Sequence, residues 1–268
     1  MINSLRARSR ILLVCISVTL AAAVRAHAAE DQNLADLSLE ELMEVRVDSV
    51  YGASKHEQKV TQAPSSVTIV TAEQIRRFGY RTLAEVLRGV RGFYVSDDRN
   101  YQYIGVRGFL RPGDYNSRIL VTVDGHRMND SIYDGAYAGR EGVVDMELIE
   151  RVEVIRGPSS SLYGSSAFFG VINVVTKRGG QFDGVELDGE GGSFDTRRGR
   201  ATYGARYANG VEWLVSASQY RSEGPARLYY PEFDQRTSEE PRAGNDGVAE
   251  GLDYEDALSV FSKLRYGS

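Results

Sequence analysis

The chain has 268 residues, 26% of them charged, and a formal net charge of −5 at pH 7. This length suffices for one large domain or two small ones, and the acidic balance argues against nucleic-acid binding, which needs cations to neutralise phosphates. Glycine and tyrosine are abundant, with 28 and 16 residues, which favours strands because these residues suit tight turns and pleated surfaces.

Residues 1–28 have the layout of a secretory signal peptide. A start with three arginines precedes an apolar run over residues 11–24, and Ala26-His27-Ala28 is a small-residue cleavage pattern. The run is shorter than the ~20 residues of a spanning helix, so we expect cleavage after Ala28 and not a membrane anchor. Cleavage would remove four arginines and no acidic residue, taking the net charge from −5 to −9, and would also remove Cys15, the only cysteine.

Residues 29–59 are expected to form an N-terminal segment and a linker that precede the first compact domain. Leucines between residues 34 and 42 suggest one short helix, and Val45 to Val50 is a β-branched run with no obvious strand beside it to pair with. A short strand of this kind can add to the sheet of a partner protein. The alternative is an ordinary linker that contains several valines.

Residues 60–180 predict an α+β domain with a mixed sheet of about four strands and short helices. A capping box at Thr71 and Gln74 begins a helix that ends at Gly79, and a second helix over residues 82–87 ends at Gly89. Asp124-Gly125 is a tight-turn signal. The strand-like segments are residues 66–71, 93–95, 103–107, 119–123, 152–155 and 171–176, with a helical turn at 146–149.

Residues 181–268 predict longer strands in which apolar and polar side chains alternate. They cover about 185–192, 200–207, 211–218 and 258–266, with a hairpin turn at Asn209-Gly210 and a break in the alternation at Leu214. Strands of ~10 residues with one apolar side suit an antiparallel transmembrane β-barrel, although a soluble β-sandwich remains the alternative. An open sheet edge in lipid leaves costly unpaired backbone groups. We therefore expect a truncated barrel, or else the barrel interpretation is wrong.

Four patches between residues 60 and 180 are more specific than any periodicity. They are residues 63–72, 104–109 (with Val106-Arg107-Gly108-Phe109), 121–127 (with Val123-Asp124-Gly125) and 149–177 (with Val154-Ile155-Arg156-Gly157-Pro158). Their order, spacing and residue choice resemble the plug domain of TonB-dependent outer-membrane receptors. The resemblance is firm over residues 60–180 and looser for the stretch from Asp36 and for the later strands.

The resemblance implies a gated, energy-coupled receptor in the outer membrane of a Gram-negative bacterium, exported by its signal peptide. The implied partners are TonB with its inner-membrane energising complex, outer-membrane lipid and a small-molecule substrate. Ferric siderophores are the commonest substrates of the family, and haem, cobalamin and sugars also occur. No nucleic acid, cofactor or metal site is implied.

The resemblance also implies roles for individual residues. The segment that binds TonB would be Val45, Arg46, Val47, Asp48, Ser49 and Val50. Arg107 and Arg156 would face acidic groups of the barrel wall, or alternatively brace turns of the plug itself. The ligand-contact candidates are Asp98, Arg99, Tyr101, Tyr115, Asn116, Tyr133 and Tyr137, and residues 222–256 would form an outward loop.

An enzyme and a periplasmic binding module are the two alternatives to the receptor. The mature chain has two histidines and no cysteine, and it contains no metalloprotease, P-loop or nucleophile-elbow motif, so we expect no catalysis. A periplasmic binding or adaptor module would also carry an export signal, but it would not need the alternating strands after Gly180. A reading frame that continues for several hundred residues beyond Ser268 would favour the receptor.

Overall fold

The structure is a computed structural model that describes residues 49–50, 58–59, 66–142, 144–234 and 246–266. The chain divides into two units, residues 1–47 and 48–268, and every described residue belongs to the second. The expected signal peptide and the helix expected between residues 34 and 42 lie outside the described residues. Within the described part, no helix is long and apolar enough to cross a membrane.

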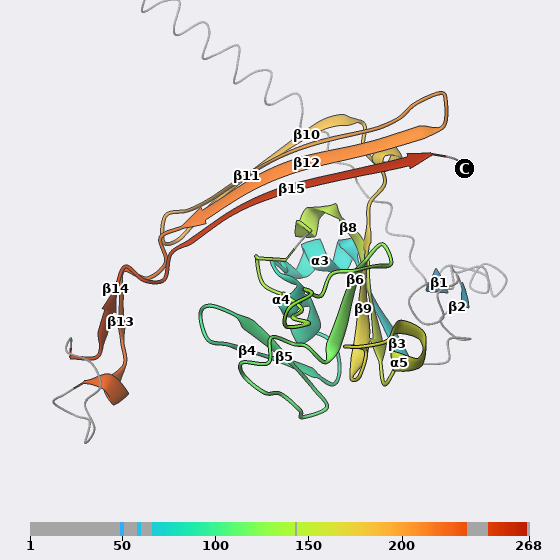
Figure 1. Cartoon of the computed structure of the whole chain (residues 1–268). Coiled ribbons are helices and arrows are strands. Elements are labelled where there is room, and N and C mark those ends of the chain that lie inside the picture. The colour runs from blue at the N-terminus through green and yellow to red at the C-terminus, as the bar shows by residue number, and fades with distance from the viewer. Residues whose placement is uncertain (1–48, 51–57, 60–65, 143, 235–245, 267–268) are drawn as a thin grey trace, which may run out of the picture. The chain divides into compact units, whose positions relative to one another are not determined.

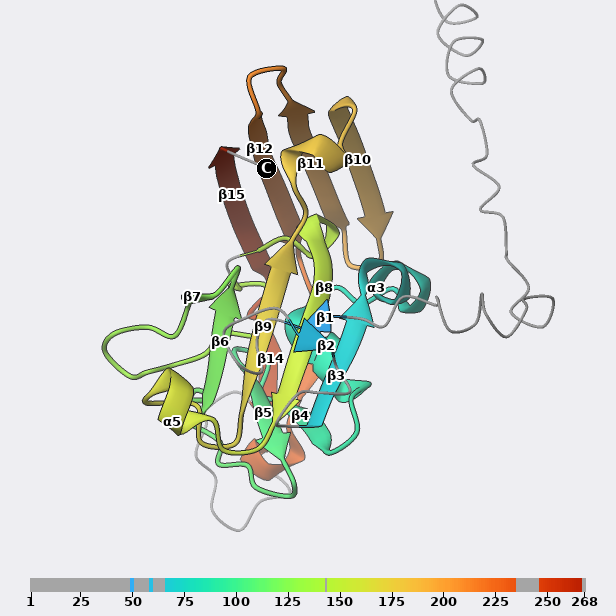
Figure 2. The same cartoon turned by 90° about the vertical axis from the view of Figure 1, so that its right-hand side faces the viewer.

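A five-stranded mixed sheet forms the centre of an α+β domain (Figures 1 and 2). Its order is β3 (Ser66–Thr71), β8 (Ile149–Arg156), β9 (Gly170–Thr176), β6 (Ile119–Val123) and β7 (His126–Arg127). The β6–β9 pair is parallel, and the other neighbouring pairs are antiparallel. The predicted mixed sheet of about four strands is confirmed, with the two-residue β7 as a fifth.

Two short helices cover this sheet, and both begin where the sequence predicts. Helix α3 (Ala72–Phe78) has a capping box, because Thr71 Oγ1 accepts from the Gln74 amide at 3.3 Å and Gln74 Oε1 accepts from the Thr71 amide at 3.0 Å. Gly79 ends α3 at φ 66°, a conformation that costs glycine nothing. Helix α4 (Leu83–Arg88) begins at its N-cap Thr82.

The hydrophobic core lies mainly on the face of the sheet covered by the helices. It joins helix residues such as Ile75 and Leu87 to sheet residues such as Val152 and Ile172. A smaller cluster around Leu120 and Ile155 packs separately. Burial of each large aliphatic side chain contributes roughly 1.5–3 kcal/mol.

Strands β4 (Phe93–Asp97) and β5 (Gln102–Val106) form a hairpin of their own and not part of the central sheet. The turn between β6 and β7 has Asp124 and Gly125 at φ 49° and 83°, as the Asp-Gly signal predicts. The remaining short elements of the domain are η3 (Met146–Leu148), α5 (Ser160–Tyr163) and η4 (Gly179–Gln181).

A four-stranded antiparallel sheet follows the α+β domain in the chain. It consists of β10 (Gly184–Gly192), β11 (Thr196–Arg206), β12 (Val211–Ser222) and β15 (Glu255–Tyr266), paired in that order. The hairpin between β11 and β12 turns at Asn209-Gly210, with Gly210 at φ 82°. All four alternating strands predicted from the sequence are therefore present.

The apolar face of this sheet is exposed, and the polar face of its central strands β11 and β12 is largely buried. Val185, Leu187, Val260 and Leu264 are between 68% and 76% exposed, whereas Thr202 and Ser216 on the opposite face are buried and hydrogen-bond each other at 2.7 Å. A sheet that covers a water-soluble core buries its apolar side instead. This arrangement favours lipid-facing strands over the soluble sandwich. Leu214, which breaks the alternation, is fully buried on the polar face.

Aromatic side chains gather at the end of the sheet that carries the Asn209-Gly210 turn. The rings of Tyr203 and Trp213 meet edge to face with centroids 6.0 Å apart, and the Tyr203 and Tyr207 hydroxyls lie 3.0 Å apart. Barrel strands commonly carry such aromatics where the apolar band meets water.

The structure shows strand pairing in two segments where the sequence did not predict it. The segment 222–256, expected as an outward loop, contains an antiparallel pair, β13 (Arg227–Tyr229) with β14 (Val248–Glu250), and the turn η5 (Pro231–Phe233). At the other end of the chain, β1 (Ser49–Val50) pairs with β2 (Gln58–Lys59). Ser49 and Val50 thus have a neighbouring strand that the sequence did not reveal, while residues 45–48 lie outside the described residues.

Candidate functional site

Three of the predicted ligand-contact tyrosines meet, although they come from three separate loops of the α+β domain. Tyr101 follows β4, Tyr115 lies in the loop between β5 and β6, and Tyr133 lies in the loop after β7. The Tyr101 and Tyr115 rings are 5.1 Å apart and edge to face, and those of Tyr115 and Tyr133 are 6.0 Å apart. We call these three residues the tyrosine cluster. Exposed aromatic groups with polar tips are suited to binding.

Asp98 holds the first of these tyrosines in position. Its Oδ1 accepts from the Tyr101 amide at 2.7 Å and its Oδ2 accepts from the Tyr103 hydroxyl at 2.8 Å. The hydrogen bond from the Tyr101 amide holds the pKa of Asp98 below its usual value, against a smaller opposing effect of desolvation. The hydrogen bond to Asp98 in turn raises the pKa of Tyr103 to about 12. Asp98 therefore acts as an anchor for the turn.

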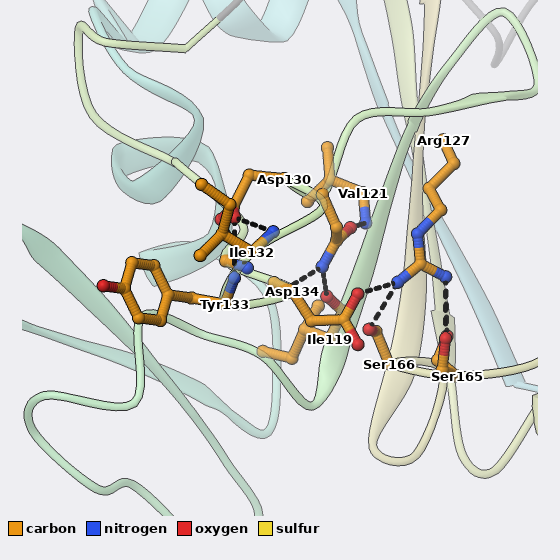
Figure 3. A network of polar contacts seen from close by, with 11 residues as sticks. Ile119, Val121, Arg127, Asp130, Ile132, Tyr133, Asp134, Ser165 and Ser166 are labelled. Atoms are coloured by element: carbon orange, nitrogen blue, oxygen red, sulfur yellow. Dashed lines mark hydrogen bonds and ion pairs between the residues drawn. The ribbon is translucent and has the colours of Figure 1, made fainter.

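Asp130 shapes the loop that carries Tyr133 (Figure 3). Its carboxylate accepts from the amides of Ile132, Tyr133 and Gly135, each at 2.8 Å. The hydrogen bonds from the Tyr133 and Ile132 amides lower the pKa of Asp130. Aspartate commonly organises turns by accepting from amides two and three residues ahead, so this feature was within reach of sequence reasoning but was missed.

Arg127 joins the Tyr133 loop to a second segment of the domain. Its Nη2 donates to Asp134 Oδ1 at 2.5 Å and to Ser166 Oγ at 2.9 Å, and its Nη1 donates to the Ser165 carbonyl at 3.1 Å (Figure 3). Asn129 ties the start of this loop to strand β6, because its Oδ1 accepts from the Val121 amide at 2.9 Å. The sequence placed Arg127 inside a motif, but the residues it joins are 38 and 39 positions away.

Asn116 is a correction to the predicted ligand contacts. It is 6% exposed, its Oδ1 accepts from the Ile104 amide at 2.7 Å, and its Nδ2 donates to the carbonyls of Gln102 and Ala136 at 2.9 and 2.8 Å. The side chain thus satisfies three backbone groups and joins its own loop to β5 and to the loop after β7. Its amide group is buried and occupied by the domain itself.

The other two ligand-contact candidates lie beside the cluster. Arg99 forms an ion pair with Asp253 at 3.0 Å, so it links the β4–β5 turn to the segment before β15. Tyr137 is half-buried; burial first, and the nearby Asp130 charge second, raise its pKa. Tyr137 lines a cavity below the cluster and not the cluster itself.

The two predicted plug–barrel arginines do not pair with the four-stranded sheet. Arg156 donates to the Arg91 carbonyl at 3.2 Å and to Ser66 Oγ at 2.6 Å, so it braces the α+β domain itself. Arg107 is exposed at φ 53°, with its amide bonded to the Gly92 carbonyl at 2.9 Å. Among the described residues, neither forms an ion pair with the four strands, whose pairs with the domain involve other residues, and contact of these arginines with a barrel wall stays a prediction.

Other residues make the contacts between the α+β domain and the sheet. Asp145 pairs with Arg198 of β11 at 2.6 Å, and Asp124 pairs with Lys263 of β15 at 2.9 Å. In these two pairs the domain supplies the acid and the sheet supplies the base, the reverse of the expected polarity. In a third pair, 3.1 Å long, Arg140 of the domain supplies the base and Glu255 of β15 supplies the acid, which is the expected polarity. The sequence did not indicate these partners because their contact depends on the packed structure.

The family model described as TonB-dependent Receptor Plug Domain matches residues 59–171. This chain carries a TonB-dependent receptor plug domain. The resemblance inferred from the motifs is thereby confirmed, and the α+β domain is called the plug below. The tyrosine cluster, Asn116 and Arg127 are all part of the matched region.

Curated relatives agree with this assignment. The chain is 32% identical over 133 residues to the "Iron-regulated outer membrane virulence protein" of Vibrio cholerae, covering 48% of this chain and 20% of the relative. It is 29% identical over 178 residues to the "Vitamin B12 transporter BtuB" of Vibrio vulnificus, covering 65% and 28%. The chain thus spans less than a third of the length of these relatives.

Solved structures support the predicted fold class. FpvA of Pseudomonas aeruginosa, bound to pyoverdine, superposes with a TM-score of 0.58 at 16% identity, covering 82% of this chain and 34% of FpvA. The ferric yersiniabactin uptake receptor FyuA of Yersinia pestis gives a TM-score of 0.51 at 22% identity, covering 75% and 29%. The names of BtuB and of the matched domain describe a transporter and a receptor, in line with the expectation of no enzymatic activity.

Proposed function

We propose that the full-length protein is an energy-coupled outer-membrane receptor that imports a scarce solute. One observation carries this proposal: the chain joins a TonB-dependent receptor plug to strands that expose apolar side chains and bury polar ones. Such strands suit a bilayer on one side and a wet lumen on the other. The curated relatives are named as outer membrane and transport proteins, which supports the same location.

The contacts between the plug and the sheet suit a plug that must be released. They include the ion pairs of Asp145, Asp124 and Arg140. Exposed ion pairs in a wet environment contribute only about 0–1 kcal/mol each, and the better covered Arg198 has two further carboxylates on its own sheet when Asp145 leaves. A modest pull therefore suffices to separate them, which would not hold for an extensive apolar interface.

We assign the pull to TonB, which would capture residues 45–50 as an added strand. Strand addition needs an unpaired backbone edge. In the described residues, β1 (Ser49–Val50) pairs with β2 alone, which leaves its second edge available. The inner-membrane complex that energises TonB would supply the force from the proton gradient.

The solute would first bind at the tyrosine cluster and the outward segment 222–256. A ferric siderophore is our first choice, with haem, cobalamin or a sugar as alternatives. Relatives named as iron-regulated and as a vitamin B12 transporter support this range. The tyrosine rings offer flat apolar surfaces beside hydroxyl groups, which suits a solute of mixed polarity.

Growth of a deletion strain tests the proposed function. A strain that lacks the gene is expected to grow poorly on one scarce source among a panel of ferric siderophores, haem, cobalamin and sugars. The full-length gene should restore growth on that source, because uptake depends on the receptor. Equal growth of both strains on every source, together with equal solute uptake, would argue against the receptor.

Tyr133→Ala is expected to weaken solute binding by about tenfold, the loss typical of an aromatic contact worth roughly 1–2 kcal/mol. Tyr133 is 66% exposed, so its removal leaves the plug core intact. Phe78→Ala is a matched control, because Phe78 is a similarly exposed aromatic at 64% and lies outside the cluster. Binding of labelled solute to whole cells measures both variants, and equal affinities for the two would remove the cluster from the binding site.

A further inference from the structure

The ion pair between Asp145 and Arg198 is short, well covered and able to exchange partners. The atoms are 2.6 Å apart, and the side chains are 7% and 14% exposed. Arg198 also lies 3.3 Å from Asp188 and 3.8 Å from Glu190 of the neighbouring strand β10. If Asp145 moves away, Arg198 therefore keeps two carboxylates on its own sheet, which lowers the cost of separation.

Asp145 also keeps a partner when the pair separates. Its Oδ1 accepts from the Glu147 amide at 3.0 Å, at the start of η3. Ser218 of β12 lies near Asp145 across the interface and also lowers the pKa of its carboxyl group. Burial acts to raise the pKa of Asp145, but the hydrogen bond and charge of Arg198 outweigh it, so the net shift is downward and the group is ionised.

A cavity of about 360 Å³ lies next to this pair. Plug residues such as Tyr137, Val121 and Leu83 line one side, and the sheet residues Tyr220 and Ser259 line another. Protein interiors are normally close-packed, and pockets that hold small ligands begin at ~300 Å³. The cavity therefore offers space for a solute with both apolar and hydrogen-bonding groups.

Residues 137–142 and 144–147, here called the gate segment, line the cavity together with the helices and the central sheet of the plug. Several backbone bonds of this segment are internal, such as Gly142 to Gly139 at 3.1 Å, and one reaches helix α4, from the Ala84 amide to the Ala138 carbonyl at 2.9 Å. The contacts of the segment with the sheet are made by side chains. Besides Asp145, the Arg140 guanidinium lies 3.7 Å from the Tyr220 ring centroid.

The ion pair of Lys263 with Asp124 differs from the Asp145–Arg198 pair, because it lies where the chain passes from the plug to the sheet. Lys263 Nζ contacts Asp124 and donates to Thr176 Oγ1, each at 2.9 Å, at the end of β9. The turn η4 then packs tightly on the sheet, since a Cβ at Gly179 would lie 2.3 Å from the Trp213 carbonyl oxygen. A Cβ at Gly204 would lie 2.6 Å from Phe182 Cβ. This side has no room to move without breaking backbone packing.

We propose that the plug opens on one side only, where the gate segment leaves β11 and β12 by exchange of the Asp145–Arg198 pair, so that solute passes through the enlarged cavity. The Lys263 side remains in place and acts as the hinge. This inference rests on the proposed function and locates the passage within it.

A reversible disulfide across the gate tests this inference in the full-length receptor. The variant carries Asp145→Cys and Ser218→Cys, two short side chains that lie near each other across the interface, and loss of free thiols on oxidation verifies that the bond has formed. Cys15 is the only native cysteine in these 268 residues. When oxidised, the variant is expected to bind solute at the surface normally and to lose at least about 90% of uptake, and a reductant is expected to restore uptake, because the bond removes only the open state.

The matched control carries Gly180→Cys and Arg206→Cys, across the hinge side, where a Cβ at Gly180 would lie 3.3 Å from Arg206 Cβ, close to the separation found in disulfides. Its oxidised form is expected to import solute at the same rate as its reduced form. Full uptake by the oxidised gate variant would overturn the inference, and so would loss of uptake in the oxidised control, because the plug would then leave as a whole.

The failure of the proposed function is distinguishable from these outcomes. In that case the wild-type receptor and both reduced variants would import none of the solutes, whatever the redox state. As a check on folding, surface binding by the reduced gate variant must match the wild type.

Asp145→Asn gives an independent measurement without a disulfide. Weaker closure of the gate is expected to raise passive entry of small antibiotics several-fold, and unchanged entry would count against the gate.

Discussion

Removal of residues 45–50 from the full-length protein is expected to reduce solute uptake to background while leaving surface binding unchanged. In the proposed function, binding depends on the tyrosine cluster, which starts at Tyr101 and is made by loops of the plug. Coupling would depend on an extended strand that TonB can add to its own sheet. Uptake of labelled solute by energised cells, compared with binding by de-energised cells, separates the two steps.

Two substitutions at Val47 sharpen this prediction. Strand addition uses backbone hydrogen bonds, so Val47→Pro, which removes an amide donor, is expected to abolish uptake. Val47→Thr keeps the backbone and the β-branched shape, and should retain most of the uptake. Val47 lies outside the described residues, so the prediction rests on the sequence alone. Normal uptake in the deletion would place the coupling segment elsewhere, and equal uptake by the two Val47 variants would show that the backbone at Val47 is not used.

Asn116→Ala is expected to destabilise the plug by about 3–5 kcal/mol, because the backbone groups of Ile104, Gln102 and Ala136 lose their hydrogen-bond partner. A second contribution arises because Asn116 has φ 61°, where alanine is strained by roughly 1–2 kcal/mol. The urea concentration at which trypsin begins to cleave the plug of the purified receptor measures the change.

Asn116→Gly separates the two contributions. Glycine tolerates positive φ, so this variant loses the hydrogen bonds without the strain and should fall between wild type and Asn116→Ala. Asn100→Ala, at an exposed position in the β4–β5 turn, is a matched control with little expected effect. If Asn116→Ala keeps the wild-type urea dependence and loses only solute affinity, Asn116 is a ligand contact after all.

The sequence predicts local structure better than it predicts which distant elements meet. The capping box of Thr71 and Gln74 and the turn at Asp124-Gly125 were predicted correctly, because each depends on residues within a few positions of one another. The alternating strands were found for the same reason. The separate β4–β5 hairpin and the parallel β6–β9 pair were not specified, since a strand carries no local signal for its partner.

The candidate site shows the same limit at the level of side chains. Tyr101, Tyr115 and Tyr133 are predicted ligand contacts because exposed aromatics in loops suit binding, and they meet in space. The same argument predicts Asn116 as a ligand contact, but its side chain points inward and satisfies buried backbone groups. A loop asparagine has the same local pattern in both cases, so only packing separates ligand contact from support.

By itself the sequence determined the family of the plug, through motifs whose residues lie close together, and the amphipathic character of the later strands, through their two-residue period. The tertiary structure alone decided that the apolar face is the exposed one and that Asp145 meets Arg198, 53 residues further along the chain. The physical reason is that an ion pair requires two charged atoms within about 4 Å. Over such a separation in sequence, that distance is set by the packing of the elements between them and not by the residues themselves.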